Sequence, residues 1–231
     1  ERTLGQMPNT LGFAEAAALP LTAITAWELL FERLQIQEGQ EDQGQSLLIV
    51  GAAGGVGSIL TQLASQLTAL KVIGSASRPQ TQDWVRGLGA DLVVDHSHPL
   101  SDVLKQAGQA QVTHVASLTH TDLHLDQLVE ALAPQGKLAL IDDPMALDVT
   151  KPMRTSLSLH WEFMYTRSLF ETADMIEQHN LLNRVAALID AGTLQTTVGE
   201  HFGTINAENL RRAHALLESG KAKGKIVLEG F

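Results

Sequence analysis

The sequence of 231 residues contains no cysteine. This absence excludes disulfide bonds, thiolate nucleophiles and cysteine-bound zinc together. No apolar run approaches the roughly 18 residues that a transmembrane helix needs, so we expect no membrane span. The beginning, ERTLGQMPN, lacks the basic and apolar regions of a signal peptide. It also lacks an initiator methionine, which suggests a fragment or a processed product.

Basic residues are scarce relative to acidic ones, with 16 Lys and Arg against 26 Asp and Glu and a formal net charge of -10. This balance argues against a nucleic-acid-binding surface and favours a soluble cytoplasmic enzyme or binding domain. The length suggests one large domain or two small ones. A hydrophobic content of 44% and a charged content of 18% are typical of a globular protein.

One glycine-rich stretch, SLLIVGAAGGVGSIL at residues 46–60, joins an apolar run to a helical pattern. A buried strand that enters a helix through glycines is the first unit of a dinucleotide-binding fold. Ala52 stands where the fingerprint usually has its first glycine, Gly54 lets the backbone approach the phosphates, and Gly57 lets the helix pack close to the strand. A purely structural glycine turn is the alternative that this stretch alone leaves open.

The next expected strand, Lys71–Gly74, ends in the sequence Ser75-Ala76-Ser77-Arg78. An NAD site has an acidic residue near this position, which binds the adenosine ribose 2′-hydroxyl. Here two hydroxyls and a guanidinium replace the carboxylate, and these groups suit a phosphate better than a diol. The segment therefore favours NADP(H) over NAD(H), and a solvated polar loop is the alternative.

Expected strands and helices alternate through the first 163 residues. The further strands are 92–94, 112–117, 137–142 after the turn Pro134-Gln135-Gly136, and an apolar segment at 156–163. The expected helices are 13–34 with Pro20 interrupting it, 80–87, 101–107 and 121–132, and 35–45 is a polar loop. This order predicts an α/β fold with a doubly wound parallel sheet of about six strands. Ligands of such sheets bind beyond the carboxyl ends of the strands, which places His96, Ser117–Thr119 and Ile141–Asp142 on the cofactor side.

The last third of the chain has a different character. Two amphipathic helices are expected, at 171–191, closed by Gly192, and at 206–219, capped by Asn206 and closed by Gly220. The final apolar run, 225–228, predicts a strand that need not belong to the main sheet.

Seven segments resemble the medium-chain dehydrogenase/reductase superfamily, in its quinone-oxidoreductase and zinc-type alcohol-dehydrogenase-like branch. They are AEAAALPLTAITAWELLF (14–31), LLIVGAAGGVGS (47–58), SASRPQT (75–81), LGADLVVDH (88–96), APQGKLALID (133–142), LHWEFMYTR (159–167) and SGKAKGKIVLEGF (219–231). The resemblance implies a barrel-like catalytic domain, then a nucleotide domain, with the chain end returning to the first domain. Most of the catalytic domain is then absent, and we expect an irregular lead-in at 1–12, a Rossmann domain at 13–169 and a returning C-terminal part at 170–231.

The resemblance also implies an activity and a set of site residues. The activity is NADPH-dependent hydride transfer to a quinone, enone or other carbonyl compound; a non-catalytic NADP(H)-binding or regulatory module is the alternative. No general acid can be assigned. The implied cofactor-binding residues are Thr25 near the nicotinamide, Gly54, Gly55, Val56 and Gly57 at the pyrophosphate, Ser75, Ser77 and Arg78 at the 2′-phosphate, and Ser117, Leu118, Thr119, Ile141 and Asp142 at the ribose and carboxamide. His96 stands where relatives often have a tyrosine near the adenosine.

Metal binding and self-association are the remaining questions. The spacings His96-x-His98 and His120-x-x-x-His124 can bind a metal, but no third ligand converges in sequence, so we expect no metal site. The segment Leu157–Tyr165 is suited to an edge strand that pairs with its own copy. The resembled family often dimerises this way, and we expect a homodimer.

Overall fold

The computed structural model describes residues 1–39 and 44–231. The expected polar loop at 35–45 therefore falls partly on residues 40–43, which lie outside the described residues. The strands are β1 Ser46–Val50, β2 Lys71–Ser75, β3 Leu92–Val94, β4 Val112–Ser117, β5 Leu132–Leu140, β6 Ser158–Trp161, β7 Val198–His201 and β8 Lys225–Val227. The helices are α1 Phe13–Ala17, α2 Pro20–Trp27, the π-helical η1 Glu28–Arg33, α3 Gly55–Leu67, α4 Pro79–Gly87, α5 Leu100–Gln106, α6 Thr121–Ala131, the 3-10 helix η2 Lys151–Thr155, α7 Thr166–Leu169, α8 Glu177–Asp190 and α9 Ala207–Glu218.

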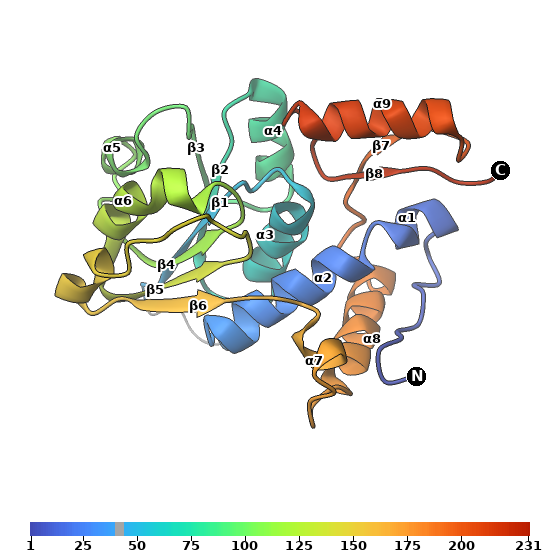
Figure 1. Cartoon of the computed structure of the whole chain (residues 1–231), viewed down its shortest axis with the longest axis horizontal. Coiled ribbons are helices and arrows are strands. Elements are labelled where there is room, and N and C mark those ends of the chain that lie inside the picture. Colours follow the sequence, from blue (N-terminus) through green and yellow to red (C-terminus); the bar gives the residue numbers. More distant parts are fainter. Residues whose placement is uncertain (40–43) are drawn as a thin grey trace.

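Six parallel strands form the main sheet in the order β3-β2-β1-β4-β5-β6 (Figure 1). This is the strand order of a dinucleotide-binding fold, with the switch point between β1 and β4. The expected fold class, an α/β doubly wound parallel sheet of six strands, is confirmed. The carboxyl ends of β1, β2 and β4 consequently lie together at one edge of the sheet.

Strand β1 is buried along its whole length because helices cover both faces of the sheet. Leu47 and Ile49 belong to the apolar cluster that α2, α3 and α8 share. Leu48 and Val50 point to the other face, where they join the cluster beneath α5 and α6. An uninterrupted apolar run is what such a two-sided burial requires.

The helical stretch Phe13–Arg33 is long and apolar enough to cross a membrane by length and composition alone. The expectation of no membrane span is based on the lack of a long uninterrupted apolar run. The length and mean hydropathy of the helical stretch form a different criterion, and the two give different answers. In the fold, 61% of the most apolar part of this stretch is buried. The apolar residues Ala23, Ala26 and Leu30 belong to the protein core.

Strand β5 differs from expectation at both ends. It begins at Leu132 and ends at Leu140, so the expected turn Pro134-Gln135-Gly136 lies inside the strand. The register shifts there, from Val112 opposite Leu132 to His114 opposite Lys137. A β-bulge of this kind absorbs extra residues without ending the strand. Asp142, expected inside the strand, lies beyond it.

The C-terminal part also departs from the predicted elements. The helix expected at 171–191 begins only at Glu177 and ends at Asp190. Glu171, its expected first residue, has a φ of +47°, outside the right-handed helical region. Strand β7 was missed, and it pairs in parallel with β8 in a separate two-stranded sheet. The final strand thus lies outside the main sheet.

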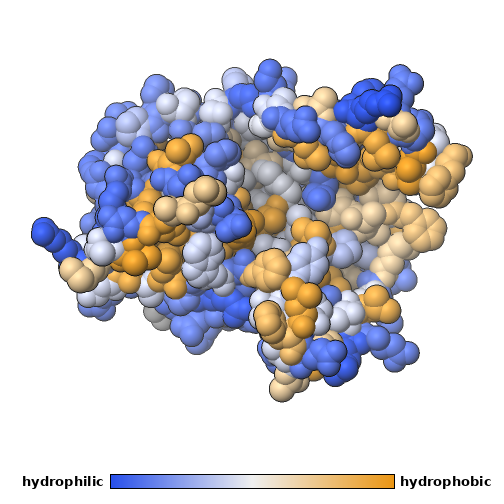
Figure 2. Space-filling view, viewed as in Figure 1, coloured by the Kyte–Doolittle hydropathy of each residue, from blue (hydrophilic) through white to orange (hydrophobic). Residues whose placement is uncertain are grey.

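The first twelve residues lie along α8 (Figure 1). The Gln6 backbone N–H donates to Asn183 at 2.8 Å, and the Asp190 carboxylate accepts hydrogen bonds from the backbone and side chains of Asn9 and Thr10. The irregular lead-in is therefore held by the C-terminal part. Figure 2 shows apolar surface at the right of this view, in the region of α1 and the segment before it. Leu4, Met7 and Phe13 are exposed apolar side chains of this part of the chain.

Candidate functional site

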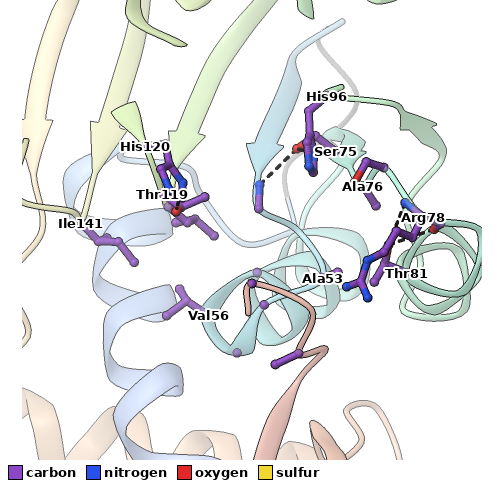
Figure 3. Close-up of a pocket in the computed structure, with 18 residues that line it drawn as sticks. Ala53, Val56, Ser75, Ala76, Arg78, Thr81, His96, Thr119, His120 and Ile141 are labelled. Carbon is purple, nitrogen blue, oxygen red and sulfur yellow. Dashed lines mark hydrogen bonds between the residues drawn. The ribbon is translucent and has the colours of Figure 1, made fainter. Parts of the chain in front are cut away.

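A cavity of about 410 Å³ lies at the carboxyl ends of β1, β2 and β4. Arg78 and Thr81 stand at one end of it and Val56 and Ile141 at the other (Figure 3). Eighteen residues line the cavity: Gly51, Ala53, Gly54, Gly55, Val56, Gly57, Ser75, Ala76, Ser77, Arg78, Thr81, His96, Leu118, Thr119, His120, Ile141, Gly220 and Ala222.

The glycine turn between β1 and α3 forms the floor of the cavity. A Cβ atom on Gly57 would lie 2.4 Å from the Gly51 carbonyl oxygen and 2.6 Å from Ala52 Cα, so only glycine fits at this contact. A Cβ on Gly54 would meet only the Gly51 oxygen, at 3.4 Å. Gly54 therefore leaves open the approach to the N-terminus of α3, where no side chain caps the first N–H groups. These free donors and the helix dipole favour an anion.

Ala52 lies behind this floor and does not line the cavity. Its side chain is fully buried in the core cluster beneath α3. The residue with positive φ in the turn is Gly51, at +81°, one position before the expected first glycine of the fingerprint. Gly51, rather than Ala52, contacts the cavity.

Ser75, at the end of β2, holds the turn in place. Its fully buried hydroxyl accepts a hydrogen bond from the Gly51 backbone N–H at 3.1 Å and lies 3.1 Å from His96 Nδ1. Because both groups that it contacts belong to the protein, the Ser75 hydroxyl holds the glycine turn in its conformation. Burial lowers the pKa of His96, against the opposing effect of the Asp95 carboxylate, so the imidazole is neutral at pH 7.

Arg78 immediately precedes helix α4, at the far end of the cavity. Its backbone N–H donates to Thr81 Oγ1 at 3.3 Å, and Thr81 Oγ1 donates back to the Arg78 carbonyl at 2.9 Å. Arg78 Nη2 donates to the Lys221 carbonyl oxygen at 2.8 Å. Ser77 lines the cavity beside it, and none of the eighteen described lining residues is a carboxylate.

Three predicted residues beyond β4 and β5 do line the cavity, namely Leu118, Thr119 and Ile141. Ser117 and Asp142 do not. The Ser117 hydroxyl lies 2.8 Å from Thr121 Oγ1, and Asp142 accepts from the backbone N–H of Thr121 at 2.8 Å. Asp142 thus caps the first turn of α6, because a carboxylate near a helix N-terminus satisfies free N–H groups.

Thr25 also lies outside the cavity lining. It is buried on α2, and its hydroxyl donates to the Leu21 carbonyl oxygen at 3.1 Å. Four of the fifteen cofactor-binding residues expected from the sequence therefore lie outside the cavity lining, namely Thr25, Ala52, Ser117 and Asp142. The other eleven line the cavity.

Seven lining residues are not among the fifteen expected cofactor-binding residues: Gly51, Ala53, Ala76, Thr81, His120, Gly220 and Ala222. Five of them are immediate neighbours or near neighbours of predicted residues. Gly220 and Ala222 come from the segment after α9, and no local pattern in the sequence connects that segment with the glycine turn.

The comparisons with known proteins agree with this architecture. The zinc-binding dehydrogenase family matches residues 88–228. A zinc-type alcohol dehydrogenase-like protein of Staphylococcus aureus (strain MSSA476) is 35% identical over 99% of this chain and 68% of its own length. A 2-methylene-furan-3-one reductase of Solanum lycopersicum is 37% identical over 99% of this chain and 50% of its own length.

A solved structure from Rhizobium etli CFN 42, named as a zinc-dependent alcohol dehydrogenase protein, superimposes on the whole chain with a TM-score of 0.93. The two sequences are 51% identical, and this chain spans 67% of that protein. The chain therefore belongs to the zinc-type alcohol-dehydrogenase-like oxidoreductases of the medium-chain dehydrogenase/reductase superfamily.

Proposed function

We propose that this chain is the cofactor-binding part of an NADP(H)-dependent oxidoreductase that reduces a quinone, enone or other carbonyl compound. The observation that carries the proposal is the cavity itself. An open helix N-terminus lies at its floor, and a guanidinium lies at the end of β2, with no carboxylate among the described lining residues. The residues present fit a dinucleotide that carries a phosphate on its adenosine ribose.

The floor of the cavity suits the pyrophosphate. Because Gly54 and Gly57 have no side chains, nothing at these positions keeps phosphate oxygens from the first N–H groups of α3. Binding there needs no side-chain charge, since backbone donors and the helix dipole supply the attraction.

The end of β2 suits the 2′-phosphate. The Arg78 guanidinium offers a planar set of donors, and Ser77 stands beside it at the cavity wall. The hydroxyl of Thr81 and the N-terminus of α4 lie on the same side. A carboxylate here would repel the phosphate, and the lining residues include none.

The opposite end of the cavity is apolar. Val56, Leu118 and Ile141 line it, and they suit the flat face of a nicotinamide ring from which water must be excluded. The bound nicotinamide supplies the hydride, and the share of this chain is to orient the ring. The enone named in the tomato relative's activity supports a conjugated carbonyl compound as the acceptor.

The residues do not fit zinc, although zinc appears in the names of relatives. The sequence has no cysteine, and the described residues contain no group of three or more His, Asp or Glu side chains that could hold a metal ion.

Titration calorimetry with NADPH and NADH tests the proposal. We expect NADPH to bind at least tenfold more tightly than NADH, because one added charge-assisted contact contributes on the order of 1.5 kcal/mol. Equal affinities, or tighter NADH binding, would contradict the 2′-phosphate assignment. We expect this cofactor-binding part by itself to reduce quinones and enones poorly. Turnover of NADPH is therefore measured with the full-length protein, where it separates an oxidoreductase from a non-catalytic binding module.

A further inference from the structure

The segment 219–225, which connects α9 to β8, lies against the cofactor cavity; we name it the C-terminal strap. Gly220 and Ala222 line the cavity. The Gly224 backbone N–H donates to the Ala53 carbonyl oxygen in the glycine turn at 2.8 Å. Arg78 Nη2 donates to the Lys221 carbonyl oxygen at 2.8 Å, across 143 positions of sequence. The strap therefore touches both the predicted pyrophosphate end and the predicted 2′-phosphate end.

The strap is tightly fixed by its neighbours. Gly224 has a φ of +54°, and a Cβ there would lie 2.3 Å from the Thr197 carbonyl oxygen. The Lys223 ammonium lies 5.0 Å from the centre of the Trp84 ring, and Trp84 Nε1 donates to Ser58 Oγ on α3 at 2.9 Å. These contacts join the strap to α3 and α4, whose N-termini both face the cavity. Because Arg78 immediately precedes α4, these contacts also fix the position of the strap relative to Arg78.

Lys221 is one of two lysines of the strap, with Lys225, whose ammonium groups have no partner among the described residues. Lys225 lies at the glycine turn, where its Cδ is 2.8 Å from the position of a Cβ on Gly55. The Lys221 ammonium makes no hydrogen bond or ion pair with any residue that the structure describes, whereas the Lys223 ammonium lies over Trp84.

Lys221 lines a small cavity of about 60 Å³ together with Arg78 and Thr81. Arg78, Thr81 and Ala222 also line the large cavity, so the two spaces adjoin. Glu200 is the one carboxylate among the lining residues of the small cavity.

The charge of the expected ligand favours a site with more than one cation. A phosphate monoester carries about -1.5 to -2 at pH 7, and one guanidinium neutralises only part of it. Lysine acts as a mobile point charge, which complements the planar donors of arginine.

We propose that the C-terminal strap is the second wall of the 2′-phosphate site and that Lys221 supplies its second cation. This inference rests on the proposed NADP(H) function. The Arg78–Lys221 carbonyl hydrogen bond keeps the guanidinium on the strap side of the cavity, and the Lys221 side chain approaches the same phosphate. The preference for NADPH over NADH is thus set by residues 143 positions apart.

The test is calorimetric titration of the 231-residue chain and its Lys221→Met variant with NADPH and NADH. Methionine removes the charge and keeps the backbone carbonyl that Arg78 uses. We expect NADPH binding to weaken about tenfold and NADH binding to stay the same. Lys221→Arg should keep the preference for NADPH, because the charge is retained.

Lys71→Met is the matched control. It removes one positive charge at the start of β2, where Lys71 Nζ donates to Gln109 at the opposite end of the strand from the cavity. We expect this variant to bind both cofactors as the parent chain does. If the parent prefers NADPH and Lys221→Met binds it equally well, the inference is overturned while the proposed function stands. If the parent shows no preference for NADPH, the proposed function itself fails.

Discussion

Glu28 and Glu162 bring two carboxyl groups together in the interior, between η1 and the end of β6. Arg33 links them, with its Nε 2.9 Å from Glu162 Oε2 and its Nη2 3.8 Å from Glu28 Oε2. Arg167 Nη1 donates to Glu28 Oε1 at 2.7 Å and also contacts Glu32. One oxygen of each carboxyl group, Glu28 Oε2 and Glu162 Oε1, is buried and accepts no hydrogen bond from any donor among the described residues. The pair therefore suits one proton held between two carboxyl groups.

This pair predicts a pH-dependent stability. Burial, and then the negative charge of Glu28, raise the pKa of Glu162 to about 8. Between its ordinary value of 4.5 and about 8, the folded chain keeps a proton that the unfolded chain releases. The free energy of unfolding should therefore fall as pH rises through this range. Burial lowers the pKa of His114 to about 4, which has the opposite effect, but only below about pH 6.5.

Glu162→Gln should flatten the pH dependence of stability between pH 6.5 and 8.5. Glutamine resembles the protonated carboxyl group in shape and carries no charge at high pH. Urea unfolding at a series of pH values measures this. The exposed substitution Glu218→Gln should leave the slope unchanged. A Glu162→Gln variant that is destabilised equally at every pH would show that the pair does not share a proton.

Arg78→Ala should weaken NADPH binding by roughly 10- to 100-fold and leave NADH binding nearly unchanged. The reason is that, in the proposed complex, the 2′-phosphate is the only part of the cofactor that the guanidinium contacts, and a charge-assisted hydrogen bond contributes about 1.5–3 kcal/mol. Calorimetry measures both affinities. Arg86→Ala is the control, because Arg86 lies on the same helix and pairs with Asp83 in solvent. Equal losses for both cofactors would mean that Arg78 does not distinguish them.

Two glycines of one turn should respond differently to alanine. A Cβ on Gly57 would meet backbone atoms at 2.4 Å and 2.6 Å, so Gly57→Ala should destabilise the fold by roughly 1–3 kcal/mol. Gly54→Ala has room within the protein, so it should fold normally and weaken NADPH and NADH equally. Thermal unfolding and calorimetry separate these outcomes. Gly87→Ala, which has no atom within 4 Å of its added Cβ, should change neither.

Strand β6 is at the edge of the main sheet. It lies within Leu157–Tyr165, the segment through which we expect the chain to form a homodimer. Trp161 is 51% exposed at the end of β6, and Phe163 and Tyr165 follow it with their rings 5.5 Å apart. An exposed edge strand with apolar side chains is a template for pairing with a second copy. We expect a dimer in sedimentation equilibrium and a monomer after Trp161→Lys. Leu217→Lys, on the exposed face of α9, should keep the dimer, and a monomeric parent chain would refute the contact.

Local chemistry made much of this fold predictable. The apolar run of β1 and the glycines after it specify a strand, a turn and a helix within fifteen residues, and each of these depends on near neighbours. The positions of most other strands along the chain follow from similar local signals. Strand β7 was missed because its burial pattern is weak, with two half-buried and two exposed residues. The helix expected from residue 171 begins only at Glu177, and Glu171 has a φ of +47° that no pattern in the sequence indicated.

The sequence by itself determined the position of the glycine turn. It also determined that hydroxyl groups and a guanidinium follow β2. Only the tertiary structure decided which polar residues remain available for a ligand. Ser117 and Asp142 are directed to Thr121, and Ser75 to Gly51, because a buried polar group must find a partner within the protein. The C-terminal strap reaches the same cavity because β7 and β8 bring it there, and no local pattern encodes a contact across 143 positions.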